Sequence, residues 1–162
     1  MSATKQPSAD PEGLDLGYLS LFVGLRFNEL VLEALLAAGF TGIRHAHGYV
    51  FQHLLADPMA VSELARHLGV TQQAASKSVA ELTSLGYLED TGSVDARVRR
   101  VALSERARAA IEKTRSIRAG YQRRLSKKHG TELARACRLL ASVLEDLGGA
   151  EAVRTRKVRA PR

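Results

Sequence analysis

The chain has 162 residues, which is enough for one domain with a substantial core. Lys and Arg number 24 against 17 Asp and Glu, and the resulting net charge of +7 favours a polyanionic partner such as nucleic acid, with a role in solubility as the alternative. Aromatic residues make up only 5% and Trp is absent, which disfavours a surface built to stack single-stranded bases.

Cysteine usage and hydropathy predict a cytoplasmic protein without a membrane partner. The one cysteine, Cys137, cannot form an intrachain disulfide, as expected in a reducing compartment. No stretch approaches the roughly 20 apolar residues that span a bilayer, and the N-terminal residues carry no signal-peptide core.

The first elements are predicted to be an arm and two helices. Residues 1–13 are rich in Ser, Pro, Asp and Gly and are predicted to be disordered. Residues 14–38 form a helix that is apolar over much of its circumference, so it is buried on more than one side, and the second side is predicted to face another subunit. Residues 43–56 form a second helix, which ends at Asp57-Pro58 because proline disfavours helix in the residue before it.

A helix-turn-helix is predicted next, with helices over Ser62–Leu68 and from Thr71 to Leu85. Gly69 permits the turn, because a positive φ is cheap only for glycine, and Thr71 is a good N-cap residue. Helical spacing turns Ala75, Val79 and Leu82 inward. The residues left facing outward are Gln72, Gln73, Ser76, Lys77 and Glu81.

A β-hairpin and two long helices complete the predicted fold. Residues 87–89 and 99–103 are short strand candidates around a turn that contains Gly92 and Asp95. Helices follow over residues 104–128, capped by Ser104, and 131–147, capped by Thr131. Residues 148–162 form a basic tail. The predicted class is mainly α with a small β-wing: a winged helix-turn-helix over 43–103, flanked by dimerisation helices over 14–38 and 104–147.

The outward face of the second short helix suits double-stranded DNA. Glutamine pairs bidentately with adenine and lysine reaches guanine or phosphate, and a helix N-terminus attracts phosphate. The hairpin adds Arg97, Arg99 and Arg100, and a narrow minor groove attracts arginine. Asp95 could hold the Arg97 guanidinium in one rotamer. The alternatives are a solvated polar face on the helix and an ordinary turn aspartate in the hairpin.

Several segments of the chain together resemble the MarR family of winged helix-turn-helix transcription regulators. They are Ser62–Ala65, Leu68–Thr71, Val79, Leu82–Leu88, Asp95–Arg97 and Val101–Ser104. The resemblance covers roughly residues 14–147, which read as one domain. It implies a homodimer, built from the terminal helices, that presents two winged motifs to a pseudopalindromic site. It also implies that Gln72, Gln73, Ser76 and Lys77 match base-reading positions and that Arg97, held by Asp95, matches a minor-groove arginine. Thr71 at the helix start and Arg99 in the hairpin complete the predicted DNA-binding set.

The resemblance also implies a possible small-molecule effector, because many members of the family bind one between the winged domain and the dimer helices. His45, Tyr49 and His53 recur at helical spacing and could face such a ligand, with Arg26 as an anion anchor; ordinary packing is the alternative. A zinc site on this helix fails, because His45 and His53 would lie roughly 12 Å apart. Cys137 is predicted to be a buried structural thiol.

The predicted function is therefore a sequence-specific regulator, most simply a repressor, with no metal and no cofactor. The chain is not expected to be an enzyme, because it lacks a Gly-rich phosphate loop, a paired-carboxylate signature and a Cys/His ligand cluster. Two alternatives stay open. One is a non-specific architectural DNA-binding protein, which the basic tail favours, and the other is a winged-helix module for protein–protein assembly.

Overall fold

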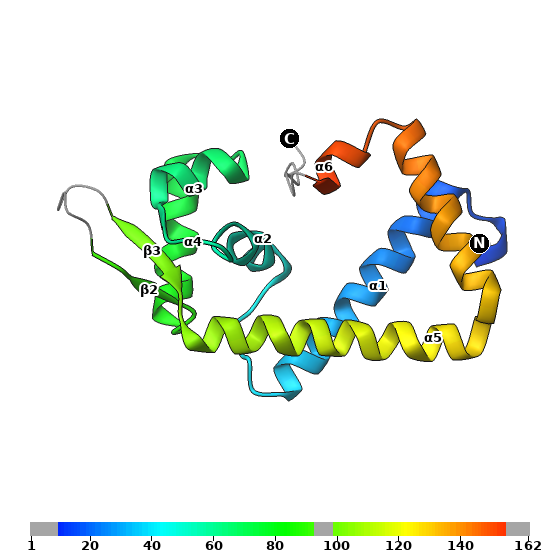
Figure 1. Cartoon of the computed structure of the whole chain (residues 1–162), viewed down its shortest axis with the longest axis horizontal. Coiled ribbons are helices and arrows are strands. Elements are labelled where there is room, and N and C mark those ends of the chain that lie inside the picture. The colour runs from blue at the N-terminus through cyan, green and yellow to red at the C-terminus, as the bar shows by residue number, and fades with distance from the viewer. Residues whose placement is uncertain (1–9, 93–98, 155–162) are drawn as a thin grey trace, which may run out of the picture.

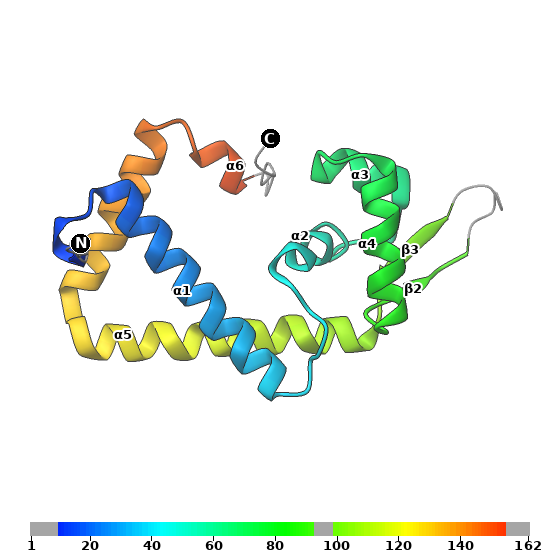
Figure 2. The ribbon, with the colours of Figure 1, turned by 180° about the vertical axis from the view of Figure 1, so that it is seen from behind.

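The computed structural model describes residues 10–92 and 99–154, arranged as a lobe of short elements at one end of a long helix (Figure 1). The lobe holds α2 (His45–His53), α3 (Val61–Leu68), α4 (Gln72–Ser84) and a small sheet. The long helix α5 (Glu105–Asp146) leads away from it. Seen from behind, α1 (Leu16–Ala37) crosses α5 obliquely and packs against it (Figure 2). The predicted class, mainly α with a small β-wing, is confirmed.

The predicted helix-turn-helix is formed by α3 and α4. Gly69 ends α3 with a φ of 71°, a conformation that costs glycine little. The side-chain oxygen of Thr71 accepts a hydrogen bond of 3.2 Å from the Ala74 N–H and so caps α4. The first of the lobe's helices, α2, is shorter than its predicted range of 43–56.

The sheet has three antiparallel strands in the order β1-β3-β2. The two predicted strands are β2 (Leu88–Asp90) and β3 (Arg100–Leu103), which pair Leu88 with Leu103. Sequence analysis missed β1 (Met59–Ala60), since two residues after a proline give no alternation to detect. The turn residues 93–98 lie outside the described ranges.

The core of the lobe lies where α3 and α4 meet the sheet. The largest fully buried side chains of this core are Leu54, Leu64, Val79, Leu82, Tyr87, Val101 and Leu103. Burial of each such aliphatic side chain contributes about 1.5–3 kcal/mol. The Tyr87 hydroxyl donates a hydrogen bond of 2.9 Å to the Thr41 carbonyl, which ties the sheet to the loop before α2. The inward face predicted for α4 is confirmed, and its packing leaves the opposite face exposed.

The two predicted C-terminal helices, 104–128 and 131–147, are the two parts of α5, which are separated by a kink at Gly130. The Ser104 side chain caps α5 by accepting from the Ala107 N–H at 3.2 Å, as predicted. At Gly130 the backbone leaves the helical region, with φ 56° and ψ −133°, and α5 bends there (Figure 1). The predicted break between the two helices is therefore confirmed, and it falls at Gly130, where glycine adopts this backbone conformation at little cost.

The chain ends and Cys137 differ from the predictions. Within the arm, Pro11–Gly13 forms a 3-10 turn capped by Asp10, and within the predicted tail Ala150–Arg154 forms α6. The rest of the predicted arm and tail, residues 1–9 and 155–162, lies outside the described ranges.

Cys137 is exposed in the isolated chain, because no described element covers its face of α5. The prediction that this thiol is buried is therefore wrong for the isolated chain.

Candidate nucleic-acid interface

The outer face of α4 gathers five of the predicted DNA-binding residues. Thr71 lies at the N-cap and is exposed, and so are Gln72, Gln73, Ser76 and Lys77 along the first two turns. The arrangement follows from burial of the opposite face. The result is a surface of amide, hydroxyl and ammonium groups at the positive end of a helix dipole, where hydrogen-bonding groups and phosphates are favoured.

The hairpin contributes an arginine that is already held by an aspartate. The Arg99 guanidinium donates to both carboxylate oxygens of Asp90, from Nε at 2.8 Å and from Nη2 at 3.1 Å. This hydrogen bonding lowers the pKa of the Asp90 carboxyl and raises that of Arg99. Sequence analysis missed Asp90, although an acid at the end of one strand and an arginine at the start of the next was an available signal. The predicted pair Asp95 and Arg97 lies outside the described residues.

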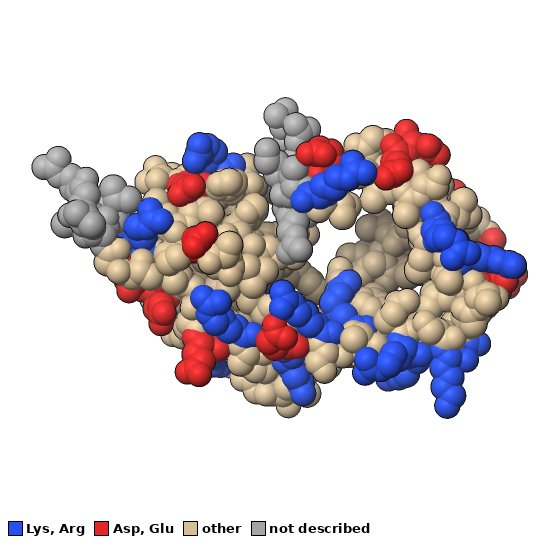
Figure 3. Space-filling model, viewed as in Figure 1, with Lys and Arg blue, Asp and Glu red and all other residues tan. Residues whose placement is uncertain are grey.

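The positive charge of the chain is concentrated away from α4. Residues 105–128, the first part of α5, contain nine Lys and Arg against two Glu. Figure 3 shows these basic side chains along the edge formed by α5. On α4 itself, Lys77 is the one basic residue and Glu81 the one acidic residue. The exposed α4 face is therefore polar rather than strongly basic, which suits hydrogen-bonded recognition more than bulk charge attraction.

Two of the four predicted effector-binding residues line one cavity of about 400 Å³ between α1, α2 and α5. They are His45 and Tyr49. Its apolar side includes Val31, Leu35, Ile43 and Phe51, and its polar side includes Arg44, Thr114 and Arg118. His53 is not among the lining residues, and its ring lies 5.4 Å from that of His67 on α3.

Arg26 lies apart from this cavity. Its guanidinium donates to Glu29 at 3.1 Å and to Glu33 at 3.2 Å on the same helix, and the hydrogen bond to Glu29 is the largest cause of its raised pKa. It borders a second, largely apolar hollow of about 810 Å³ between α1 and α5, next to Phe22 and Tyr121. The structure therefore divides the four predicted residues among three places.

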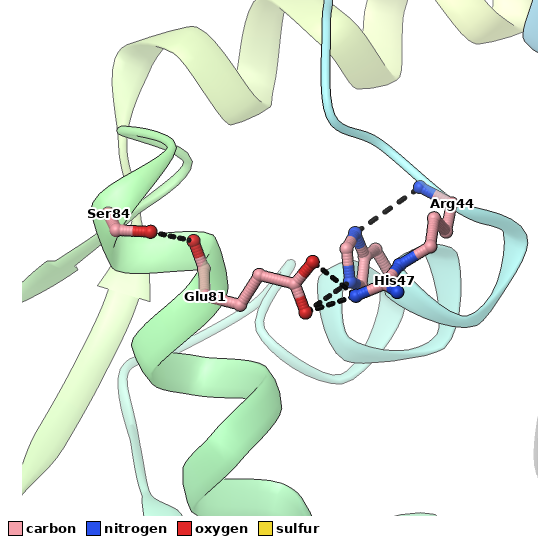
Figure 4. Close-up of polar contacts among 4 residues, drawn as sticks. All are labelled: Arg44, His47, Glu81 and Ser84. Carbon is pink, nitrogen blue, oxygen red and sulfur yellow. Dashed lines mark hydrogen bonds and ion pairs between the residues drawn. The ribbon is translucent and has the colours of Figure 1, made fainter.

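A polar cluster links the start of α2 to α4 (Figure 4). The Arg44 guanidinium donates to both carboxylate oxygens of Glu81, and His47 Nε2 lies 3.7 Å from Glu81 Oε2. His47 Nδ1 accepts a hydrogen bond of 3.3 Å from the Arg44 backbone N–H, and its side chain is only 3% exposed. Sequence analysis placed Glu81 on the outer face and gave no role to His47, because nothing local in the sequence joins residues so far apart.

Burial lowers the pKa of His47, with the Arg44 charge lowering it further and Glu81 opposing the shift. The unfolded chain, in which histidine titrates near 6.5, therefore binds more protons below that pH. The contribution of His47 to stability is fully present above pH about 6.5 and is lost as the pH falls toward the folded pKa. We expect the free energy of unfolding to fall over this window and His47→Gln to flatten the fall, measured by urea denaturation at a series of pH values. His45→Gln, at an exposed position on the same helix, should keep the wild-type slope; equal slopes for both variants would contradict the assignment.

The described residues form a winged-helix fold with an exposed polar face on α4, and part of the chain is similar in sequence to a known family. A sequence model of the MarR family matches residues 39–97. No curated protein matches the chain in sequence.

Solved structures of MarR-family proteins share the fold over most of the chain. YusO from Bacillus subtilis is 22% identical with a TM-score of 0.62, covering 80% of this chain and 94% of that chain. A mutant of MarR from E. coli is 25% identical with a TM-score of 0.61, covering 81% and 97%. MepR of S. aureus, solved in complex with DNA, is 18% identical with a TM-score of 0.64, covering 81% and 98%. Residues 39–97 of this chain are therefore similar in sequence to the MarR family, and the chain shares the fold of these solved structures.

Proposed function

We propose that the protein is a sequence-specific DNA-binding regulator, most simply a repressor, that acts in the cytoplasm as a homodimer on a pseudopalindromic site. The observation that carries this proposal is the exposed polar face at the start of α4, held outward by the buried Ala75, Val79 and Leu82. Similar structures support it: MepR is solved with DNA, and CouR, described as a transcriptional repressor, is bound to a 23-mer duplex at 23% identity and a TM-score of 0.59.

The candidate DNA-binding residues are suited to different contacts with DNA. Gln72 and Gln73 are suited to read adenine edges in the major groove, and Lys77 to reach guanine or phosphate. Thr71 and Ser76 offer hydroxyl groups that can hydrogen-bond to phosphates of the DNA backbone. In the wing, Arg97 oriented by Asp95 is suited to a narrow minor groove. Arg99, held by Asp90, stiffens the hairpin and can keep one edge of its guanidinium for a phosphate.

Exposed apolar side chains support the homodimer. They lie on the first half of α1, at the end of α5 and on α6, and include Tyr18, Leu21, Phe22, Leu25, Leu139, Leu140, Leu147 and Val153. A monomer rarely leaves so many large apolar side chains in water. A two-fold pairing through these helices would cover them and present two α4 helices to one face of DNA.

A small-molecule effector is part of the proposal. The cavity between α1, α2 and α5 lies between the winged lobe and the helices assigned to the dimer, and it offers both apolar walls and polar groups. Among the described residues, no helix is long and apolar enough to cross a membrane.

The test of this function is selection of binding sites from random duplex DNA with the purified chain at physiological salt. We expect one two-fold symmetric motif whose half-site centres lie about one helical turn apart. Binding without a motif would favour the architectural alternative, to which the basic face of α5 lends weight, and absence of binding would favour the protein-interaction alternative.

Gln73→Ala tests the reading face directly. Loss of one bidentate base contact is expected to cost about 1–3 kcal/mol of binding free energy and to relax the selected motif at one position in each half-site. Gln122→Ala removes the same side chain from an exposed position on α5 and should leave both affinity and motif unchanged. An unaltered motif with Gln73→Ala would remove this residue from the reading set.

A further inference from the structure

The part of α5 just before its bend carries a cluster of positive charge. Four of the six residues from 123 to 128 are basic and exposed: Arg123, Arg124, Lys127 and Lys128. We call these four residues the elbow cluster. Figure 3 shows basic side chains along the edge of the molecule that α5 forms on its way to the bend. Residues 105–128 have a surplus of seven basic over acidic residues, which equals the net charge of the whole chain.

The elbow cluster has no carboxylate partner among the residues that the structure describes. Two other arginines of α5 are paired: Arg115 donates to Glu112 at 2.5 Å, and Arg135 donates to Glu132 at 2.8 Å. Within the cluster, like charges follow one another at a spacing of four residues, which destabilises a helix. The dipole of the helical segment that ends at Gly130 offsets only about half an elementary charge. The cluster is therefore a concentration of positive charge that the described part of the chain does not compensate.

Two cations of the cluster lie on the side of α5 that faces away from α1. Tyr121 and Leu125 turn toward α1, and the Tyr121 ring centre lies 5.7 Å from that of Phe27. Arg123 and Lys127 each follow one of these residues by two positions, which places them on the opposite side of the helix. Pairing of two copies through the exposed apolar side chains of α1 would therefore leave both cations in solvent.

The surroundings of the elbow cluster favour a rigid polyanion over a lipid surface or single-stranded bases. Apart from the cluster, the exposed residues from 119 to 128 are Ala119, Gln122 and Ser126. A lipid surface is bound by cations together with large apolar side chains, and single strands are bound by exposed aromatic rings. This face offers charge and hydrogen-bonding groups alone, which suit the phosphates of a duplex.

The density of charge in the cluster matches that of duplex DNA. At 1.5 Å per residue, the four cations occupy about 8 Å of helix axis, and the same length of duplex carries roughly five phosphate charges. Arg123 lies roughly 27 Å along the helix from the start of α5, beside β3. Phosphates bound by the cluster would therefore belong to a segment of DNA other than the half-site under α4 of the same protomer.

We propose that the elbow cluster is a second surface for duplex DNA, which binds phosphates without reading bases and lets a protein bound at its own site through α4 hold a second DNA segment. The inference rests on the proposed function for the first contact, whereas the contact of the cluster needs no base recognition. The second segment comes either from DNA that flanks the site on the same duplex or from a separate duplex. The phosphate chemistry is the same in both cases, and the experiment distinguishes them.

The chain offers a matched pair of double variants. Arg123→Gln with Lys127→Gln removes two exposed charges that pair with no described group, so the fold and the dimer should be unaffected. The control, Arg135→Gln with Arg138→Gln, removes the same charge from exposed positions of α5 after the bend. Thermal unfolding and sedimentation equilibrium are recorded for both variants. If only the first variant dissociates into monomers, the cluster belongs to the dimer interface and the proposal is overturned.

The experiment measures capture of a second duplex. A duplex just long enough for the selected site is immobilised and saturated with protein, and a labelled duplex of random sequence is then added. A second arm compares the affinity of the protein for this short duplex and for one with long flanks. In at least one arm, we expect wild-type protein and the control to gain DNA contact, and the elbow variant to lose about tenfold or more of that gain. Occupancy of the selected site should stay the same.

Capture of the second duplex assigns the contact to a separate duplex, and a gain from the flanks assigns it to the same duplex. Absence of both gains in the wild-type protein would overturn the proposal, and so would gains that persist in the elbow variant.

Two further probes replace the labelled duplex in the capture step, namely phosphatidylserine vesicles and single-stranded RNA. Capture of either one without capture of duplex DNA would overturn the proposal in favour of that partner. If the wild-type protein selects no DNA site, the proposed function fails, and the cluster is tested by affinity for a random duplex. The elbow variant should then bind about tenfold or more weakly than the control, and equal affinities would overturn the inference as well. A selected site with unchanged capture leaves the function intact and removes only this inference.

Discussion

Replacing Leu25 with glutamate is expected to turn a dimer into monomers. Leu25 is 50% exposed and lies in a stripe with Tyr18 and Leu21, which are 59% and 52% exposed. A side chain in a two-fold interface occurs twice, so the variant would bury two carboxylates without partners. Loss of the leucine contacts and the cost of each charge should raise the dimer dissociation constant by about 100-fold or more, measured by sedimentation equilibrium.

The control for Leu25→Glu is a charge on the same helix outside the apolar stripe. Ser20→Glu adds a carboxylate at an exposed polar position of α1 and should leave the dimer intact. DNA affinity is expected to fall with Leu25→Glu, since two half-sites can no longer be engaged together. A Leu25→Glu protein that stays dimeric would show that α1 pairs through another face or not at all.

Local signals in the sequence were sufficient to predict the helix-turn-helix. Gly69 adopts a positive φ and Thr71 caps α4, and both effects involve only neighbouring residues. The sequence therefore predicts both without knowledge of the tertiary fold. The inward spacing of Ala75, Val79 and Leu82 is similarly local and sufficed to identify the exposed polar face of α4.

Interactions between distant segments could not be predicted in this way. Arg44 and Glu81 are 37 residues apart and meet only because α2 and α4 pack in one lobe. Strand β1 exists only because β3 offers it a partner. The effector residues were chosen by helical spacing on α2, but which of them line the cavity is decided by the neighbouring helices: α1 and α5 enclose His45 and Tyr49, whereas His53 lies against α3.

The loop between α1 and α2 should be intolerant of a side chain at Gly42. This residue has a φ of 78°, and an added Cβ would lie 2.7 Å from Leu85 Cδ2 and 2.9 Å from Leu85 Cδ1 at the end of α4. Gly42→Ala therefore combines a left-handed backbone, costing roughly 1–2 kcal/mol, with overpacking that costs about 1–3 kcal/mol. We expect a total loss of roughly 2–5 kcal/mol in the free energy of unfolding, measured by urea denaturation at fixed protein concentration.

Gly39→Ala separates the two causes, because Gly39 has a φ of 90° and no atom within 4 Å of its added Cβ. It should show only the backbone cost, so the difference between the two variants measures the contact of the loop with Leu85. That contact and the bond from Tyr87 to Thr41 hold the same loop against the end of α4 and the start of β2. Equal losses for the two variants would mean that Leu85 moves aside freely. The start of α2, and Arg44 with it, would then be positioned by the Glu81 cluster rather than by the packing of this loop.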